Sequence, residues 1–118
     1  MAGFNRDERV RRRSEYKTVY DSGTKIHGRL FTLFSLPTEL PHGRLGIAAT
    51  RKLGGAVQRN RAKRLIREVF RRNKPVTGVD VVVIPKRNLL DASLTALESE
   101  FRQILSRSLR RAGAPPRV

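Results

Sequence analysis

Apolar side chains recur along the chain with two periods, and these periods predict where helices and strands lie. Tyr16, Val19 and Tyr20 fall at positions i, i+3 and i+4, which places them on one face of a short helix. Ser14 is a suitable N-cap for this helix and Gly23 a suitable stop. The pattern therefore predicts a first helix between these two residues.

Alternating and continuous apolar runs predict the strands. Residues 30–36 and 44–50 read as two long strands, and the turn-rich connection between them favours their pairing as a hairpin. A shorter strand is expected near residues 25–27. The β-branched run at residues 79–84 predicts a central strand that is buried on both faces.

Two longer amphipathic helices complete the pattern. The first covers residues 57–72, and its apolar stripe consists of Ala62, Leu65, Ile66, Val69 and Phe70. The second follows a capping box at Thr95 and Glu98, reaches residue 111, and has a stripe of Leu97, Phe101, Ile104, Leu105 and Leu109. The resulting order, α-β-β-β-α-β-α, is typical of a single α+β domain over residues 14–111, between a basic arm (1–13) and a tail (112–118).

The charge of the chain is strongly one-sided. It has 26 lysine and arginine residues against 10 acidic residues, a net charge of +16 over 118 residues. Such an excess repels itself in the compact state unless an anion screens it, which favours nucleic acid as a partner and leaves an anionic membrane surface as the alternative. Neither a membrane span nor a secretory h-region is present in the sequence, so we expect a cytoplasmic protein.

Few residues of the chain are suited to catalysis. The absence of cysteine excludes disulfides and thiolate chemistry. His27 and His42 have no metal-ligand spacing, and Asp80 is the sole acid between Glu68 and Asp91. A two-metal nuclease needs several converging carboxylates. We therefore expect neither catalytic residues nor a metal site in the polypeptide itself.

The basic residues concentrate in the helix predicted over residues 57–72 and around it. Residues 51–74 hold ten lysines and arginines and one acid, Glu68. The face opposite the apolar stripe carries Asn60, Arg64, Arg67 and Arg71, flanked by Arg61 and Lys63. Like charges at i, i+3 and i+4 destabilise a helix, as do cations near its N-terminus. A polyanionic partner explains this arrangement; the alternative is a basic face that is merely solvated.

The aromatic residues allow two interpretations. Tyr16, Tyr20 and Phe34 could belong to the core. However, Phe34 points to the strand face opposite Phe31 and Leu33, and only one face needs to meet the long helices. The other face could be a platform on which single-stranded bases stack.

Several motifs together resemble the protein subunit of bacterial ribonuclease P, from about Arg9 to Arg111. They are Ser14-Glu15-Tyr16 with Val19-Tyr20 and Gly23, Arg29-Leu30-Phe31-x-Leu33-Phe34, Arg44-Leu45-Gly46-Ile47, and a block that matches the family's RNR signature, Lys52-x-Gly54-x-Ala56-Val57-x-Arg59-Asn60-Arg61-x-Lys63-Arg64-x-x-Arg67-Glu68.

The resemblance implies a fold and a function. The fold is the same α-β-β-β-α-β-α order, with a mixed four-stranded sheet and a left-handed βαβ crossover. The function is that of one protein copy in an endoribonuclease ribonucleoprotein, whose separate RNA uses Mg²⁺ to hydrolyse the 5′ leader from precursor tRNA. The metal would be held mainly by that RNA.

The resemblance also implies roles for residues. Contact with the catalytic RNA is implied for Arg59, Asn60, Arg61, Lys63, Arg64 and Arg67, and the helical spacing adds Arg71. Contact with the 5′ leader, in a cleft between the sheet and the basic helix, is implied for Tyr16, Tyr20, Phe34 and Lys52. Two other hypotheses stay open from the residues alone: a ribosome-associated or general RNA-binding protein, and a metal-dependent nuclease in its own right.

Overall fold

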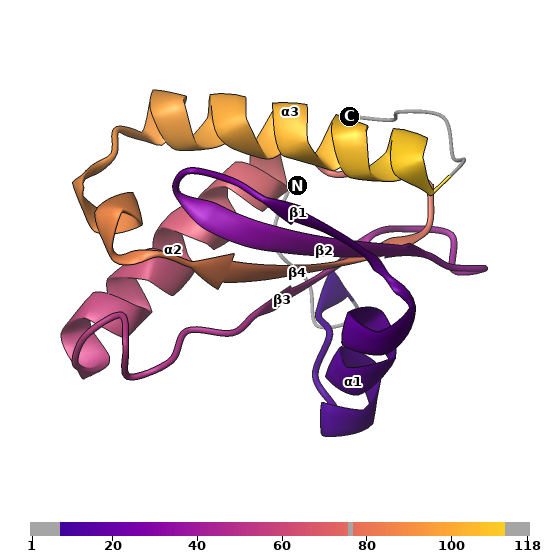
Figure 1. Ribbon diagram of the computed structural model, residues 1–118, viewed down its shortest axis with the longest axis horizontal. Coiled ribbons are helices and arrows are strands. Elements are labelled where there is room, and N and C mark those ends of the chain that lie inside the picture. The colour runs from indigo at the N-terminus through magenta and orange to yellow at the C-terminus, as the bar shows by residue number, and fades with distance from the viewer. Residues whose placement is uncertain (1–7, 76, 113–118) are drawn as a thin grey trace.

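The computed structural model describes residues 8–75 and 77–112, which form three α-helices, four strands and one 3-10 helix. In chain order these are α1 (Arg13–Ser22), β1 (Thr24–His27), β2 (Phe31–Pro37), β3 (Arg44–Ile47), α2 (Ala56–Arg72), β4 (Val79–Pro85), η2 (Arg87–Asp91) and α3 (Leu94–Arg111). This order confirms the predicted α+β domain (Figure 1).

The four strands form one mixed sheet in the order β1-β2-β4-β3. β2 is antiparallel to β1 and β4, whereas β3 is parallel to β4. The predicted β2–β3 hairpin is therefore wrong, because β4 lies between these strands; Asp80, for example, has Leu36 on one side and Arg44 on the other. A strand as apolar as β4 is best placed at the centre, with a neighbour on each side and both faces covered.

Parallel neighbours β3 and β4 are joined through α2, as in the βαβ crossover that the family resemblance implies. The left-handed sense of that crossover stays a prediction.

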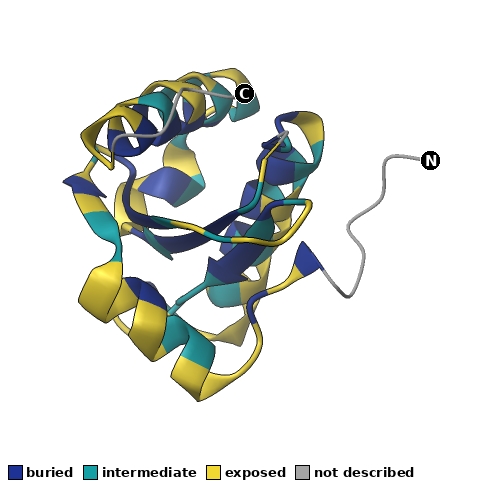
Figure 2. Cartoon of the chain, turned by 90° about the vertical axis from the view of Figure 1, so that its right-hand side faces the viewer, coloured by how far each residue is buried: buried dark blue, intermediate teal, exposed yellow. Residues whose placement is uncertain are grey.

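The helices cover the two faces of the sheet unequally. α2 and α3 pack on one face and α1 on the other (Figures 1 and 2). Leu33 and Val81 belong to the large core under α2 and α3, while Phe34 and Val82 pack against Val19 of α1. This split confirms the predicted alternation along β2, and it places Phe34 on the α1 side of the sheet.

Several element boundaries differ from the prediction. α3 begins at Leu94, because the Ser93 side chain accepts a hydrogen bond from the N–H of Ala96 (3.1 Å); the capping box expected at Thr95 and Glu98 is wrong. β3 ends at Ile47 instead of residue 50. Its partner β4 ends at Pro85, which has no N–H to continue the ladder.

α1 begins at Arg13, one residue before the predicted N-cap at Ser14. The reason is the Glu15 carboxylate, whose Oε1 accepts hydrogen bonds from the N–H groups of Arg11 (3.0 Å) and Arg12 (2.9 Å). A carboxylate in the first turn also interacts favourably with the helix dipole.

Residues 8–12, predicted as part of a basic arm, lie against the exposed edge of β3. Arg9 forms a parallel bridge with Leu45, and the N–H of Val10 donates to the Leu45 carbonyl (2.9 Å). Val10 is buried, and Lys74 forms an ion pair with Glu8 (2.9 Å). The folded part thus extends N-terminal to the predicted boundary and covers a strand edge that would otherwise be unpaired. The rest of the arm and the tail from residue 113 lie outside the described residues.

Arg44 fastens α1 to the sheet through two carboxylates. Its Nε and Nη2 donate to the two oxygens of Asp80 (2.8 and 2.7 Å), and its Nη1 donates to Glu15 (2.9 Å). These bonds raise the pKa of Arg44, chiefly through Asp80. The backbone N–H of Arg12, then that of Arg11, and then Arg44 lower the pKa of Glu15 to about 2. We call Arg44, Glu15 and Asp80 the Arg44 clamp.

Tyr16 gives α1 a second attachment to the sheet. Its hydroxyl oxygen accepts a hydrogen bond from the N–H of Ile47 (3.2 Å). Its ring lies over Gly46, where an added Cβ would come within 2.9 Å of the ring atoms. Because a side chain at position 46 would displace the ring, glycine there sets the position of Tyr16.

The Arg44 clamp makes the stability of the fold depend on pH. Since the folded-state pKa of Glu15 is depressed from 4.5 to about 2, its contribution is present above pH 4.5 and is lost as the pH falls towards 2. We expect Glu15→Gln to lower the free energy of unfolding at pH 7 by about 1–2 kcal/mol and to flatten its dependence on pH in this range. Denaturant unfolding between pH 2 and pH 7 measures both effects.

Asp21→Asn is the matched control, because Asp21 pairs with Lys17 on the exposed side of the same helix. Such a pair contributes about 0.3–0.5 kcal/mol. An unchanged pH profile in Glu15→Gln would show that the clamp does not stabilise α1.

Candidate nucleic-acid interface

The apolar stripe of α2 determines which side chains of this helix face solvent. Ala62, Ile66, Val69 and Phe70 are fully buried against the sheet and α3, as predicted, and Leu65 is half-buried. Because they fix the rotation of the helix, the polar residues on the opposite side must point outward.

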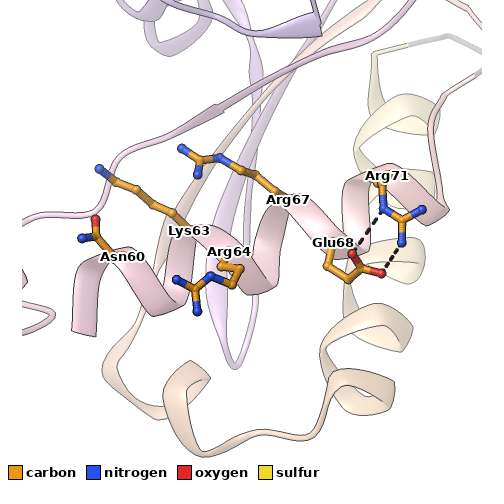
Figure 3. A pocket seen from close by; sticks show the side chains of 6 residues that line it. All are labelled: Asn60, Lys63, Arg64, Arg67, Glu68 and Arg71. Carbon is orange, nitrogen blue, oxygen red and sulfur yellow. Dashed lines mark hydrogen bonds and ion pairs between the residues drawn. The ribbon is translucent and has the colours of Figure 1, made fainter. Parts of the chain in front are cut away.

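The outward side of α2 forms an open groove of about 400 Å³, which we call the α2 groove (Figure 3). Its lining residues are Asn60, Lys63, Arg64, Arg67, Glu68 and Arg71. Five of them were predicted as RNA contacts from the sequence. The other two predicted contacts do not line it: Arg59 is half-buried and Arg61 is exposed elsewhere on the helix.

Glu68 is a member of this groove that the sequence prediction did not include. It forms ion pairs with Arg71 and, at 2.9 Å, with Arg72 (Figure 3 shows the pair with Arg71). These partners lower the pKa of Glu68, Arg71 most of all. The spacings i+3 and i+4 were visible in the sequence. Glu68 orients Arg71, and the remaining cations leave the groove positive.

A smaller pocket of about 220 Å³ lies beside the α2 groove. We call it the leader cleft after the leader contact that the family resemblance implies for Tyr16, a contact that stays a prediction here. It is lined by Arg9, Val10, Arg11, Tyr16, Leu45, Ile47, Lys63 and Arg67. Lys63 and Arg67 line both hollows. The two therefore form one basic surface that runs from α2 past the edge strand β3 to α1. The contribution of residues 9–11 was missed, since a basic run gives little sign that Val10 is anchored.

Three aromatic rings continue this surface from Tyr16 along α1 and β2. The ring centroids of Tyr16 and Tyr20 are 6.3 Å apart, and those of Tyr20 and Phe34 are 4.9 Å apart in an edge-on arrangement. Tyr20 is 37% exposed but Phe34 only 8%. Lys25 lies 5.5 Å from the Phe34 ring centre. The ring of Tyr20 is therefore accessible to solvent, and the buried ring of Phe34 packs against it.

Of the four residues predicted to contact the leader, the structure brings three together. Tyr16, Tyr20 and Phe34 form the aromatic cluster, and Tyr16 lines the leader cleft. Lys52 is exposed in the turn before α2 and is not among the residues that line the cleft.

Tyr16 and Tyr20 are both uncharged at neutral pH, and partial burial moves their pKa values further above the ordinary value of 10. Neutral rings do not repel phosphate, and a neutral hydroxyl can donate a hydrogen bond. The cluster is thus suited to stacking on bases next to cations that neutralise the backbone.

The acidic groups are not arranged for metal binding in the part of the chain that the structure describes. There, no three histidine, aspartate or glutamate side chains lie close enough to hold an ion. Glu8, Glu15, Glu68 and Asp80 are paired with lysine or arginine. The residues that the structure describes therefore do not fit a resident Mg²⁺ ion. Nor is any helix within residues 8–75 and 77–112 long and apolar enough to span a membrane.

Comparison of this chain with known proteins identifies the family to which it belongs. The family model described as Ribonuclease P matches residues 4–109. The ribonuclease P protein component of Thermotoga maritima is 41% identical over 88 residues, which are 73% of this chain and 75% of that protein. The corresponding protein of Staphylococcus epidermidis is 34% identical over 99 residues, 82% of this chain and 86% of that protein.

Solved structures agree with these sequence matches. The RNase P protein from Thermotoga maritima superposes with a TM-score of 0.76 at 32% identity, covering 85% of this chain and 96% of that one. The RNase P protein of Staphylococcus aureus gives a TM-score of 0.72 at 28% identity, with 89% and 94% covered. Fold and sequence therefore lead to the same conclusion as the motifs: this chain belongs to the ribonuclease P protein family.

Proposed function

We propose that this chain binds the catalytic RNA of ribonuclease P and the 5′ leader of precursor tRNA, and so supports removal of the leader. The observation that carries the proposal is the continuity of the basic surface: Lys63 and Arg67 line both the α2 groove and the leader cleft. A phosphate chain can follow these cations along α2 to Tyr16, which belongs to the aromatic cluster.

The α2 groove is the proposed contact with the catalytic RNA. Arg64, Arg67 and Arg71 offer planar guanidinium groups that can bind a phosphate through two hydrogen bonds. Arg59 and Arg61, outside the groove, extend the positive region around the same helix. In this proposal each RNA binds one copy of the chain.

The leader cleft is the proposed contact with single-stranded leader. Bases can stack on Tyr20 and Tyr16 while Arg9, Arg11 and Lys63 neutralise the backbone. Phe34 holds Tyr20 in place, and the exposed Lys52 adds charge in the turn before α2. Stacking accepts any base, which suits leaders of different sequence.

The hydrolysis itself belongs to the RNA in this proposal. Mg²⁺, held by the RNA, would supply the activated water and charge stabilisation that such phosphate chemistry needs. This chain contributes binding. Its excess of cations lowers the repulsion between the phosphates of leader and ribozyme, and the complex then needs less Mg²⁺ to assemble. The cellular outcome is maturation of the tRNA 5′ end.

Charge reversal in the α2 groove tests the first contact. We expect Arg64→Glu to weaken binding to the catalytic RNA and to make the salt dependence of the affinity shallower, by about 0.7–0.9 in log–log slope for each phosphate that is no longer neutralised. Filter binding at several salt concentrations measures both. Arg87→Glu in η2 reverses an exposed charge outside the groove and is the control. Equal affinity of Arg64→Glu and wild type at every salt concentration would exclude this contact.

Removal of one ring tests the second contact. We expect Tyr20→Ala to weaken binding of precursor tRNA with a long leader by about 1–3 kcal/mol, the value of one stacked base, and to leave leaderless tRNA unaffected. Tyr20→Phe keeps the ring and should bind like wild type. If Tyr20→Ala weakens the binding of both RNAs equally, the leader does not lie on this ring.

A further inference from the structure

α3 carries a second basic surface that the proposed function does not use. Its outward side forms an open groove of about 440 Å³, here called the α3 groove. Its lining residues are Arg102, Gln103, Ser106, Arg107 and Arg110. None of them lines the α2 groove or the leader cleft. α3 also covers the face of the sheet opposite α1 (Figure 1), so this surface is separate from the aromatic cluster.

The acidic residues of α3 do not neutralise these cations. Glu98 accepts a hydrogen bond from the Asn73 side chain (2.7 Å), and Glu100 accepts one from the N–H of Leu30 (2.7 Å). Both carboxylates are thus directed into the fold. Among the residues that the structure describes, no ion pair involves an arginine of α3.

The helix dipole explains only part of this charge. Arg110 and Arg111 lie in the last turn of α3, where cations stabilise a helix. Arg102 and Arg107 lie earlier, beyond the reach of that effect. Arg107 also has like charges at i+3 and i+4, an arrangement that destabilises a helix in the absence of an anion. A row of cations that no carboxylate of the described residues pairs with indicates an anionic ligand.

We propose that the α3 groove binds the phosphodiester backbone of a second, base-paired stretch of the same RNA. This inference rests on the proposed function, because it adds a contact to the same partner. Guanidinium groups bind phosphate through bidentate hydrogen bonds. The net charge of +16 also favours a polyanion as the ligand. Among the residues that the structure describes, no aromatic side chain lines the groove, so these residues offer charge and hydrogen bonds to a backbone but no platform for unpaired bases.

A charge-matched pair of double variants tests the contact in the full chain. Arg102→Gln/Arg107→Gln removes two cations from the groove. Arg29→Gln/Arg87→Gln removes two exposed cations from the β1–β2 turn and η2. With a bacterial ribonuclease P RNA as ligand, we expect the α3 double variant alone to bind more weakly. The slope of log affinity against log salt concentration should be shallower by about 0.7–0.9 for each phosphate that the variant leaves without a cation.

The outcomes separate this inference from the proposed function. If the two double variants bind the RNA with the same reduced affinity, the α3 groove is not a contact. If Arg64→Glu binds more weakly while the α3 double variant matches its control, the α2 contact stands and the α3 inference is wrong. If neither binds more weakly, both are wrong.

A crosslinking measurement needs no change of charge. Since the chain has no cysteine, Gln103→Cys and Thr95→Cys each provide a single attachment site for a short photo-crosslinker, in the groove and on the exposed N-terminal part of the same helix. In the reconstituted complex we expect position 103 to crosslink to paired nucleotides and position 95 to give little product. Equal yields at the two positions, or crosslinks from position 103 to unpaired nucleotides only, would overturn the proposal.

Discussion

Burial of the apolar stripe of α2 is the constraint on which the rest of the molecule depends. Ile66, Val69 and Phe70 are at most 2% exposed, and burying a side chain of this size contributes about 1.5–3 kcal/mol. A repulsive pair of like charges on the opposite face costs only a few tenths of a kcal/mol. Burial of the apolar face therefore outweighs the repulsion among Arg64, Arg67 and the neighbouring cations, which stay close together on the face that solvent reaches. The apolar face thus determines the positions of the cations on which the proposed RNA binding depends.

The other half of the interface is held by polar bonds. α1 buries only Val19 completely, and its position depends on the Arg44 clamp and on the contact of Tyr16 with Gly46 and Ile47. These bonds join α1, β3 and β4 at the side of the sheet away from α3. The aromatic cluster is thus set by directional hydrogen bonds, whereas the α2 groove is set by packing. The two meet at Lys63 and Arg67, where a charged backbone can pass from one to the other.

Features encoded locally could be predicted from the sequence. The apolar spacing in α2 indicated its buried face, and the alternation in β2 separated Phe34 from Leu33, because both depend on residues a few positions apart. The pairing of β2 with β4 could not be predicted, since it joins residues more than 40 positions apart, such as Phe31 and Pro85. Val10 was missed for the same reason, because its partner, the carbonyl of Leu45, lies far along the chain. Glu68 was missed although its partners Arg71 and Arg72 lie only one turn later, because the prediction considered the cations of α2 alone.

The central claim is that this chain supplies binding while an RNA supplies catalysis. Reconstitution tests it most directly. The purified, nucleotide-free chain, a bacterial ribonuclease P RNA, and the two together are each incubated with precursor tRNA at low Mg²⁺, and removal of the 5′ leader is followed. We expect rapid cleavage by the combination, little by the RNA alone and none by the chain alone. Cleavage by the isolated chain, or a combination no faster than the RNA alone, would contradict the claim.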